Sequence, residues 1–139
     1  MLEVTPTPVK LPVAVTDEIR EYISDLKVDR TVKTSLQDVY GWMVQAFLAD
    51  KKLQEKFAAW LDQPDGATWG EEKLINFRMP AKLDLDMRIA LGKLGYRLGR
   101  RLTIRQLFLF MSSSFVSGAK MRGAYERHLR DRGRPKRKP

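Results

Sequence analysis

Residues 9–48 and residues 77–116 align with each other without a gap, so that residue 9 pairs with residue 77 and every later pair keeps the same spacing. We call this spacing the repeat offset. Few positions are identical, but the pattern of side-chain size and polarity repeats, which is typical of a duplicated supersecondary unit. The identical pairs include Pro12 and Pro80, Arg20 and Arg88, Leu26 and Leu94, Met43 and Met111, and Phe47 and Phe115. We expect each copy to be a short strand followed by two helices, and the two copies to complete one core between them.

A strand is predicted at the start of each copy, because apolar residues alternate there with polar or small ones. The residues expected to point away from the core are Lys10, Pro12 and Ala14 in the first copy, and Arg78, Pro80 and Lys82 in the second. Proline cannot donate to a strand ladder. Its recurrence at the same outward position favours a two-stranded antiparallel ribbon with Pro12 opposite Pro80 in a pair without hydrogen bonds. That register would place Lys10 opposite Lys82 and Ala14 opposite Arg78.

Each predicted strand is followed by residues that favour helix starts. Thr16 and Asp84 are expected to cap the first helices. The second helices are expected to begin at Ser35 and Thr103, each with an acidic or amide side chain three residues later, as in a capping box. Apolar residues recur in both second helices with the helical period, and we interpret them as core. They are Leu36, Val39, Tyr40, Met43 and Phe47, and Ile104, Leu107, Phe108, Met111 and Phe115.

This repeated strand-helix-helix unit resembles the ribbon-helix-helix superfamily of DNA-binding proteins. The resemblance covers both copies and rests on pattern more than on identity. Residues 9–15 (VKLPVAV) read like the strand of such a protein, and residues 99–105 (GRRLTIR) match the entry to its second helix. Most members are homodimers, but this chain is similar to the minority that carry two units in one polypeptide. Those include the TraY-type relaxosome proteins of conjugative plasmids and the VirC-type overdrive-binding proteins of Ti plasmids.

The resemblance implies a mainly α-helical fold with a short two-stranded antiparallel ribbon, in which two ribbon-helix-helix units form a pseudo-dimer that is monomeric without DNA. The ribbon would enter the major groove of double-stranded DNA. The base-facing residues would be Lys10, Pro12, Ala14, Arg78, Pro80 and Lys82, with Arg78 and Lys82 best suited to guanine. The residues that hold flanking phosphates would be Lys33, Thr34, Ser35, Arg100, Arg101 and Thr103. The prolines stand where the family usually has a polar base-reading side chain.

The expected organisation is an N-terminal arm at 1–8, unit 1 at 9–49, a connector at 50–76, unit 2 at 77–118 and a basic C-terminal helix or tail at 119–139. In the connector, Leu53, Phe57 and Trp60 share one face of a helix predicted from Lys51 to Leu61. A turn is expected after it, at residues 62–66. The three tryptophans, of which Trp69 also lies in the connector, are expected to be packing anchors.

The net charge of +9 is concentrated at the C-terminal end of the chain. Residues 117–139 hold 9 Lys or Arg against 2 Asp or Glu, whereas residues 1–116 hold 17 against 15. Within the repeat, residues 78–105 carry 8 basic against 2 acidic side chains, so the second copy is the more cationic. A basic surface of this kind suits the DNA backbone, where affinity comes largely from counterion release. A solvated charge run remains the alternative interpretation of the tail.

The tail also contains a short motif that resembles the core of an AT-hook, an Arg-Gly-Arg-Pro segment that lies in narrow minor grooves. The glycine would let the backbone approach the groove floor, and the arginines would enter its negative potential. The residues assigned to this minor-groove tail are Arg132, Gly133, Arg134, Lys136, Arg137 and Lys138. The segment is poor in apolar residues, so we expect it to be disordered when free.

Little in the sequence favours an enzyme. The chain has one histidine, His128, which we expect to be solvated or to contact phosphate in the basic tail. Ser112, Ser113 and Ser114 lie within a helical stripe without a partner base, and no phosphate-binding glycine loop is present. No cofactor or metal is predicted, and the chain has no cysteine. No apolar run is long enough to span a bilayer and the N-terminus does not resemble a secretory signal, so a cytoplasmic protein is expected.

Three functions are compatible with these observations. The first is an accessory role in conjugative or T-DNA-type plasmid DNA transfer, with binding near a transfer origin or border and a relaxase as a possible partner. It rests on the resemblance to the tandem-unit proteins. The second is a transcriptional repressor or antitoxin, which is the common role of ribbon-helix-helix dimers. The third is a helical scaffold subunit of a nucleoprotein complex.

Overall fold

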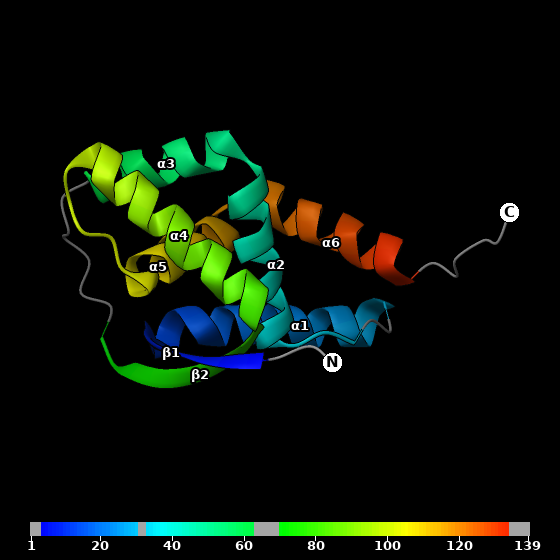
Figure 1. Cartoon of the computed structure of the whole chain (residues 1–139). Helices are drawn as coiled ribbons and strands as arrows, with labels where there is room; N and C mark the ends of the chain where they lie inside the picture. Colours follow the sequence, from blue (N-terminus) through cyan, green and yellow to red (C-terminus); the bar gives the residue numbers. More distant parts are fainter. Residues whose placement is uncertain (1–3, 31–32, 63–69, 134–139) are drawn as a thin grey trace, which may run out of the picture.

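The computed structural model describes residues 4–30, 33–62 and 70–133. In this part of the chain six helices lie on one side of a two-stranded antiparallel sheet, which forms one edge of the molecule (Figure 1). The elements are β1 (Val4–Pro12), α1 (Val13–Arg30), α2 (Leu36–Ala49), α3 (Lys51–Leu61), β2 (Glu72–Pro80), α4 (Ala81–Leu98), α5 (Ile104–Ser117) and α6 (Ala119–Gly133). The mainly helical fold with a short antiparallel ribbon is therefore confirmed.

The bounds of several elements recur at the repeat offset. β1, α1 and α2 begin and end at the positions equivalent to the bounds of β2, α4 and α5, respectively. The starts of α3 and α6, at Lys51 and Ala119, are separated by the same distance along the chain. The spacing found in the sequence alignment therefore extends beyond residues 9–48 and 77–116 at both ends. Each set of elements is a strand followed by three helices.

The strands lie further toward the N-terminus than predicted. They begin at Val4 and Glu72, and residues 13–15 and 81–83 are the first turns of α1 and α4. Residues 4–8 are therefore strand and not an N-terminal arm, and residues 72–76 do not belong to the connector. Pro12 and Pro80 directly precede α1 and α4, and Pro80 is the N-cap residue of α4 without a side-chain cap hydrogen bond. The alternation that suggested a longer strand continues by chance into the first helical turn.

The expected caps of the first helices were wrong for the same reason. Thr16 lies one turn inside α1, where its hydroxyl donates to the carbonyl oxygens of Pro12 and Val13 at 3.3 and 3.1 Å. Asp84 lies inside α4 and is buried. Its carboxylate accepts a hydrogen bond from the Thr7 hydroxyl of β1 at 2.9 Å and one from Arg88 Nε at 2.8 Å. Asp84 therefore ties the start of α4 to the opposite strand.

The register of the ribbon also differs from the prediction. Pro8 lies opposite Asn76 at the centre of the ribbon, Val4 opposite Pro80 and Pro12 opposite Glu72. The predicted pairs Pro12–Pro80, Lys10–Lys82 and Ala14–Arg78 do not occur. Alternation of side chains has a period of two, so any shift by an even number of residues keeps the same residues facing the core. The burial pattern alone could not distinguish these registers.

The new register explains how β1 accommodates three prolines. The ladder of backbone hydrogen bonds between the strands continues just beyond the end of β1. There the Val13 amide donates to the Glu71 carbonyl at 2.9 Å. In an antiparallel pair hydrogen-bonded and non-hydrogen-bonded positions alternate, so the odd-numbered residues of β1 carry the ladder and the even-numbered ones do not. Pro6, Pro8 and Pro12 all fall at even positions, so their missing N–H groups remove no ladder bond.

The core is centred on two stacked rings. Tyr40 of α2 and Phe108 of α5 are fully buried, with ring centroids 5.1 Å apart and planes inclined by 7°. Phe77 of β2 packs against both, at 4.9 and 5.1 Å. The stripes predicted for the second helices are therefore core, which anchors α2 and α5 to the inner side of the ribbon. The Tyr40 hydroxyl is hydrogen-bonded to the hydroxyl of Ser112, which donates to the Phe108 carbonyl at 2.6 Å.

The stability of the fold should depend on pH through Tyr40. Burial raises the pKa of its phenol from 10.0 to about 12, opposed by the Ser112 hydrogen bond and by Arg20. Since the folded-state pKa is the higher, the stabilising contribution is complete below about pH 10 and is lost as the pH rises to about 12. Over that interval the free energy of unfolding, measured by chemical denaturation, should fall by about 2–3 kcal/mol less in Tyr40→Phe than in the parent protein, because phenylalanine does not titrate. Equal losses in both proteins would assign the pH dependence to other groups.

Candidate nucleic-acid interface

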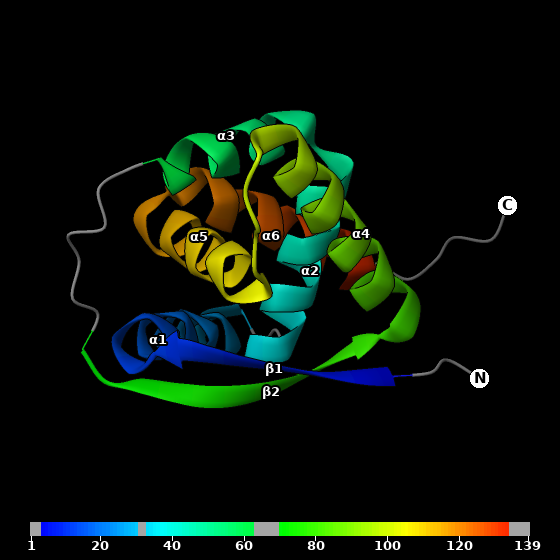
Figure 2. The ribbon, with the colours of Figure 1, turned by 60° about the vertical axis from the view of Figure 1, so that its left-hand side comes forward.

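One face of the ribbon is exposed along its length. The exposed side chains, which we call the outward ribbon face, are Val4, Pro6, Pro8 and Lys10 of β1 and Leu74, Asn76, Arg78 and Pro80 of β2. The opposite face contributes Thr7, Val9, Leu11, Phe77 and Met79 to the core. The outward ribbon face lies on the side away from the helices (Figure 2).

Only part of the predicted base-facing set lies on this face. Lys10, Arg78 and Pro80 do, whereas Pro12 is buried. Ala14 is in the first turn of α1. Lys82 is in the first turn of α4, where its ammonium lies 3.0 Å from Asp86. The error in the strand bounds accounts for the misplacement of Ala14 and Lys82, whereas Pro12 is the last residue of β1.

Sequence reasoning missed the central residues of the outward ribbon face, namely Pro6, Pro8, Leu74 and Asn76. A signal for them was present. Pro6, Pro8 and Pro12 are separated by even intervals, and only one side of a two-stranded ribbon tolerates repeated prolines. That spacing could have located both the strand and its outward side.

The outward ribbon face sets polar side chains opposite apolar ones. Its opposed pairs are Pro6 with Arg78, Pro8 with Asn76, and Lys10 with Leu74. Each proline is short and rigid, so the long side chain opposite it is exposed to solvent. The three polar groups are a guanidinium, an amide and an ammonium, all of which can donate hydrogen bonds. Both carboxylate oxygens of Glu72, at the end of the ribbon, accept from Arg105 Nη2 at 2.7 and 2.8 Å.

The starts of α2 and α5 are tied to the two edges of the ribbon. Gln37 Oε1 of α2 accepts a hydrogen bond of 2.9 Å from the Arg78 amide, which points away from β1. On the other edge, Arg105 Nε of α5 donates to the Lys10 carbonyl at 3.2 Å. Residues 37 and 105, like residues 10 and 78, are related by the repeat offset, so the two contacts occupy equivalent positions. Both helix starts are thereby fixed beside the outward ribbon face.

The predicted caps of these two helices are confirmed. The Ser35 hydroxyl accepts a hydrogen bond from the Asp38 amide at 3.1 Å. Thr103 forms a complete capping box, in which its hydroxyl accepts from the Gln106 amide and Gln106 Oε1 accepts from the Thr103 amide. The first amides of a helix have no carbonyl partner within it, and the dipole makes this end positive. Both helix starts therefore have the chemistry of weak anion sites.

The basic residues around the start of α5 line a surface hollow of about 530 Å³ between α4 and α5. Arg88, Arg100 and Arg101 border it, together with Thr103 and Ile104. Arg88 is also paired with the buried Asp84, and Arg100 lies 3.5 Å from Asp62. Arg101 is exposed. The hollow combines guanidinium groups with a helix start, a combination suited to phosphate.

Two glycines shape the turn that carries these arginines. Gly99 ends α4 with a φ of 70°, in the left-handed region that favours glycine, and its amide donates to the Tyr96 carbonyl. The Arg100 amide donates to the Gly95 carbonyl at 2.9 Å. A Cβ at residue 95 would lie 2.5 Å from the Arg100 carbonyl oxygen, so the close approach requires glycine there. The turn thus holds residues 100 and 101 against the end of α4.

The corresponding residues before α2 are less available. Lys33 is exposed, but the Thr34 hydroxyl is hydrogen-bonded to the hydroxyl of Tyr125, so it takes part in the contact with α6. Ser35 uses its hydroxyl as the cap of α2. The phosphate-binding residues predicted from the sequence therefore form two unequal groups, and the cationic one lies at the start of α5.

The C-terminal residues are more ordered than expected as far as Gly133. Tyr125 and Leu129 of α6 are buried, and the Tyr22 hydroxyl of α1 donates to Glu126 at 2.8 Å. His128 packs against Trp42 and Tyr125 with centroids 6.1 Å from each, so its assignment to a solvated tail was wrong.

The backbone of Arg132 and Gly133 is helical, not extended as a minor-groove segment would be. Arg134, Lys136, Arg137 and Lys138 lie outside the described residues, as does Trp69. Trp42 and Trp60 pack against other rings, as predicted.

No protein-family model, curated protein or solved structure matches this chain. Among the residues that the structure describes, no cluster of His, Cys, Asp or Glu could hold a metal ion. Over the same residues, no helix has both the length and the apolar character needed to cross a membrane. Function must therefore be inferred from the geometry of the ribbon and its flanking helix starts.

The register can be tested by cross-linking, since the chain has no native cysteine. Pro8→Cys with Asn76→Cys places two thiols in a non-hydrogen-bonded pair, where Cα atoms are about 4.5 Å apart. That separation lies within the range of disulfides. Mild oxidation should join them within one chain, detectable by peptide mass. Pro12→Cys with Pro80→Cys is the control, and rapid cross-linking of that pair would support the alternative register.

Proposed function

We propose that this protein binds double-stranded DNA in a sequence-specific manner by inserting the ribbon into the major groove. The supporting observation is the outward ribbon face, an exposed two-stranded surface with Lys10, Asn76 and Arg78 between two fixed helix starts. A two-stranded ribbon fits the width of the major groove, where base edges carry a distinct pattern of donors and acceptors. The role is non-catalytic.

We propose further that the chain is a tandem ribbon-helix-helix protein, with one unit from each copy. The recurrence of element bounds at the repeat offset supports this. So does the centre of the ribbon, because Pro8 and Asn76 are themselves related by that offset and lie directly opposite each other. An antiparallel ribbon built from two equivalent strands has its pseudo-two-fold axis at such a pair.

The chemistry of each side chain suggests a base partner. Arg78 suits the N7 and O6 atoms of guanine, and Asn76 suits the N6 and N7 atoms of adenine near the centre of the site. Lys10 can contact a second guanine, and Leu74 can pack against a thymine methyl group. Pro6 and Pro8 of β1 have no hydrogen-bonding side chain, so β2 supplies most of the direct readout. The preferred site is therefore asymmetric.

Phosphate contacts flank this readout. The start of α5, with Arg101 and the adjacent hollow, would hold one DNA backbone, and the start of α2, with Lys33 and Ser35, the other. Because the group at the start of α5 is the more cationic, it should hold its DNA backbone more strongly than the group at the start of α2 holds the other. Arg134, Lys136, Arg137 and Lys138 would add minor-groove or backbone contacts.

For the biological role, we propose an accessory factor in plasmid DNA transfer that marks a transfer origin or border for a relaxase. The support is the resemblance to proteins with two units in one chain. A repressor or antitoxin is the alternative, in which the same face would read an operator. Selection of binding sites from random DNA, followed by a search for those sites in the DNA that encodes the chain, separates these roles. Sites beside a nick site favour transfer, and sites in promoters favour repression.

Replacing Arg78 or Asn76 with alanine should reduce discrimination between the selected site and random DNA by about 1–3 kcal/mol each, because the variant cannot form the bidentate base contact. Arg101→Ala should weaken binding to all sequences about equally. Lys82→Ala is the matched control, since Lys82 lies on α4 beside Asp86 and should leave discrimination unchanged. Titrations with both DNAs at one salt concentration measure these ratios. Normal discrimination by the Arg78 and Asn76 variants would refute base reading by this face.

Deleting residues 134–139 removes Arg134, Lys136, Arg137 and Lys138 but leaves α6 whole. If these residues lie along DNA, affinity should fall and the log–log salt slope should become shallower by about 0.9 for each phosphate that the shortened chain no longer neutralises. Sequence preference and thermal stability should be retained, because the segment consists of basic residues and proline and offers little to the core. An unchanged affinity and slope would show that the tail is a solvated charge run.

A further inference from the structure

α4 carries an apolar stripe that faces solvent. Leu85, Ile89 and Tyr96 are 55%, 46% and 92% exposed, and they recur with the spacing of one helix face. Gly92 lies in the same row and adds no side chain between Ile89 and Tyr96. Lys93 and Arg97 are exposed beside the stripe. Large apolar side chains in a row on the surface commonly mark an interaction site.

The equivalent face of α1 has the opposite character. The repeat offset relates Leu85, Ile89 and Tyr96 to Asp17, Glu21 and Val28, all of which are exposed. Among the exposed side chains of α1 described by the structure, four are acidic (Asp17, Glu18, Glu21 and Asp25) and two are basic (Arg20 and Lys27). The two copies thus share one backbone plan but present complementary charge on their first helices.

A single chain cannot bring these two faces together. α1 and α4 lie on opposite sides of the molecule above the ribbon, as Figure 2 shows. When the ribbon faces DNA, α1 is directed to one side of the complex and α4 to the other. Neighbouring copies in the same orientation would therefore set α4 of one against α1 of the next.

We propose that the α4 face is a docking surface for α1 of a second copy of this chain, so that copies bound side by side on DNA contact each other head to tail. An antiparallel arrangement of the two helices places Lys93 and Arg97 near Glu21 and Glu18. It also places Val28, which is 81% exposed, near Leu85. The contact is heterologous, so it can add copies in one direction along the DNA.

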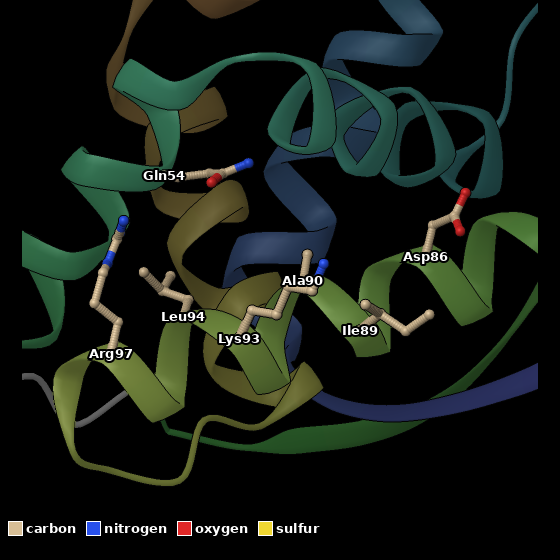
Figure 3. Close-up of a pocket in the computed structure, with 7 residues that line it drawn as sticks. All are labelled: Gln54, Asp86, Ile89, Ala90, Lys93, Leu94 and Arg97. Atoms are coloured by element: carbon tan, nitrogen blue, oxygen red, sulfur yellow. The ribbon is translucent and has the colours of Figure 1, made fainter.

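The surface beside the stripe is also hollowed, which favours side-chain insertion. A cavity of about 460 Å³ lies between α3 and α4, lined by Gln54, Asp86, Ile89, Ala90, Lys93, Leu94 and Arg97. Figure 3 shows Gln54 on α3 across this space from the α4 side chains. Side chains of the neighbouring α1 can enter this space.

The binding of neighbouring copies on DNA rests on the proposed function, so the test separates the two. Titration of a short random duplex that accommodates one chain measures DNA binding alone. Titration of a long duplex measures coupling between copies, and we expect the second copy to bind about tenfold more tightly than the first. Sedimentation of the full chain at low salt and high concentration measures the protein contact without DNA.

Charge reversal tests the complementarity. Lys93→Glu with Arg97→Glu should abolish coupling on the long duplex, and so should Glu18→Lys with Glu21→Lys in a separate protein. Mixing the two proteins restores opposite charges wherever unlike copies meet, so coupling should return in the mixture. Lys52→Glu with Lys56→Glu on α3 is the matched control for the first protein, because it makes the same change in net charge at two exposed positions. Each is two residues from Gln54, so both lie on the side of α3 opposite to the space that Gln54 lines. This control should retain coupling.

Three outcomes decide between the proposals. Loss of coupling in each reversed protein, with recovery in the mixture, supports the head-to-tail contact. Normal binding to the short duplex without coupling on the long one, together with a monomer in sedimentation at low salt, would overturn the contact and leave the DNA-binding proposal intact. Failure to bind either duplex would overturn DNA binding, and sedimentation of the mixture would still decide the contact between copies.

Discussion

The fold depends on the alternation of hydrogen-bonded and non-hydrogen-bonded pairs in one short ribbon. In a two-stranded antiparallel ribbon all pairs of one kind face one side. The pairs that carry the ladder point inward, where Thr7, Val9 and Phe77 pack beneath the helices. The pairs that do not carry it point outward, and there proline costs no ladder bond. The outward ribbon face and the core are therefore two consequences of one backbone pattern.

Local signals allowed the sequence to predict much of this structure. The starts of α2 and α5 follow from Ser35 and Thr103, because a cap and a helical apolar stripe agree at each position. The bounds of α3 were predicted correctly, since the turn after Leu61 limits it. The core of the second helices followed from periodicity. Each of these features depends on residues that lie close together in the sequence, so the sequence alone could predict it.

Two of the errors have a common physical origin in long-range pairing. Strand alternation cannot fix a register, because a shift by any even number of residues leaves every side chain on its face. Asn76 was missed for another reason, because β2 begins at Glu72 and the predicted strand began after residue 76. His128 was misplaced because its environment is made by Trp42 of α2, which is distant in sequence. Tyr125 and Leu129, one helical turn apart, were the available sign that α6 packs on the core.

The stacked pair at the centre of the core has a consequence for how the two halves can combine. Under the proposed duplication Tyr40 and Phe108 occupy equivalent positions, as do Val44 and Ser112, so the axis passes between unlike residues. The Tyr40 hydroxyl finds its partner only in the other half. Two first halves joined to each other would bury two phenols against Val44, and two second halves would offer no phenol to Ser112. Under that proposal the bond between Tyr40 and Ser112 favours the pairing of unlike halves over the pairing of two first halves, which would leave buried phenols without this partner.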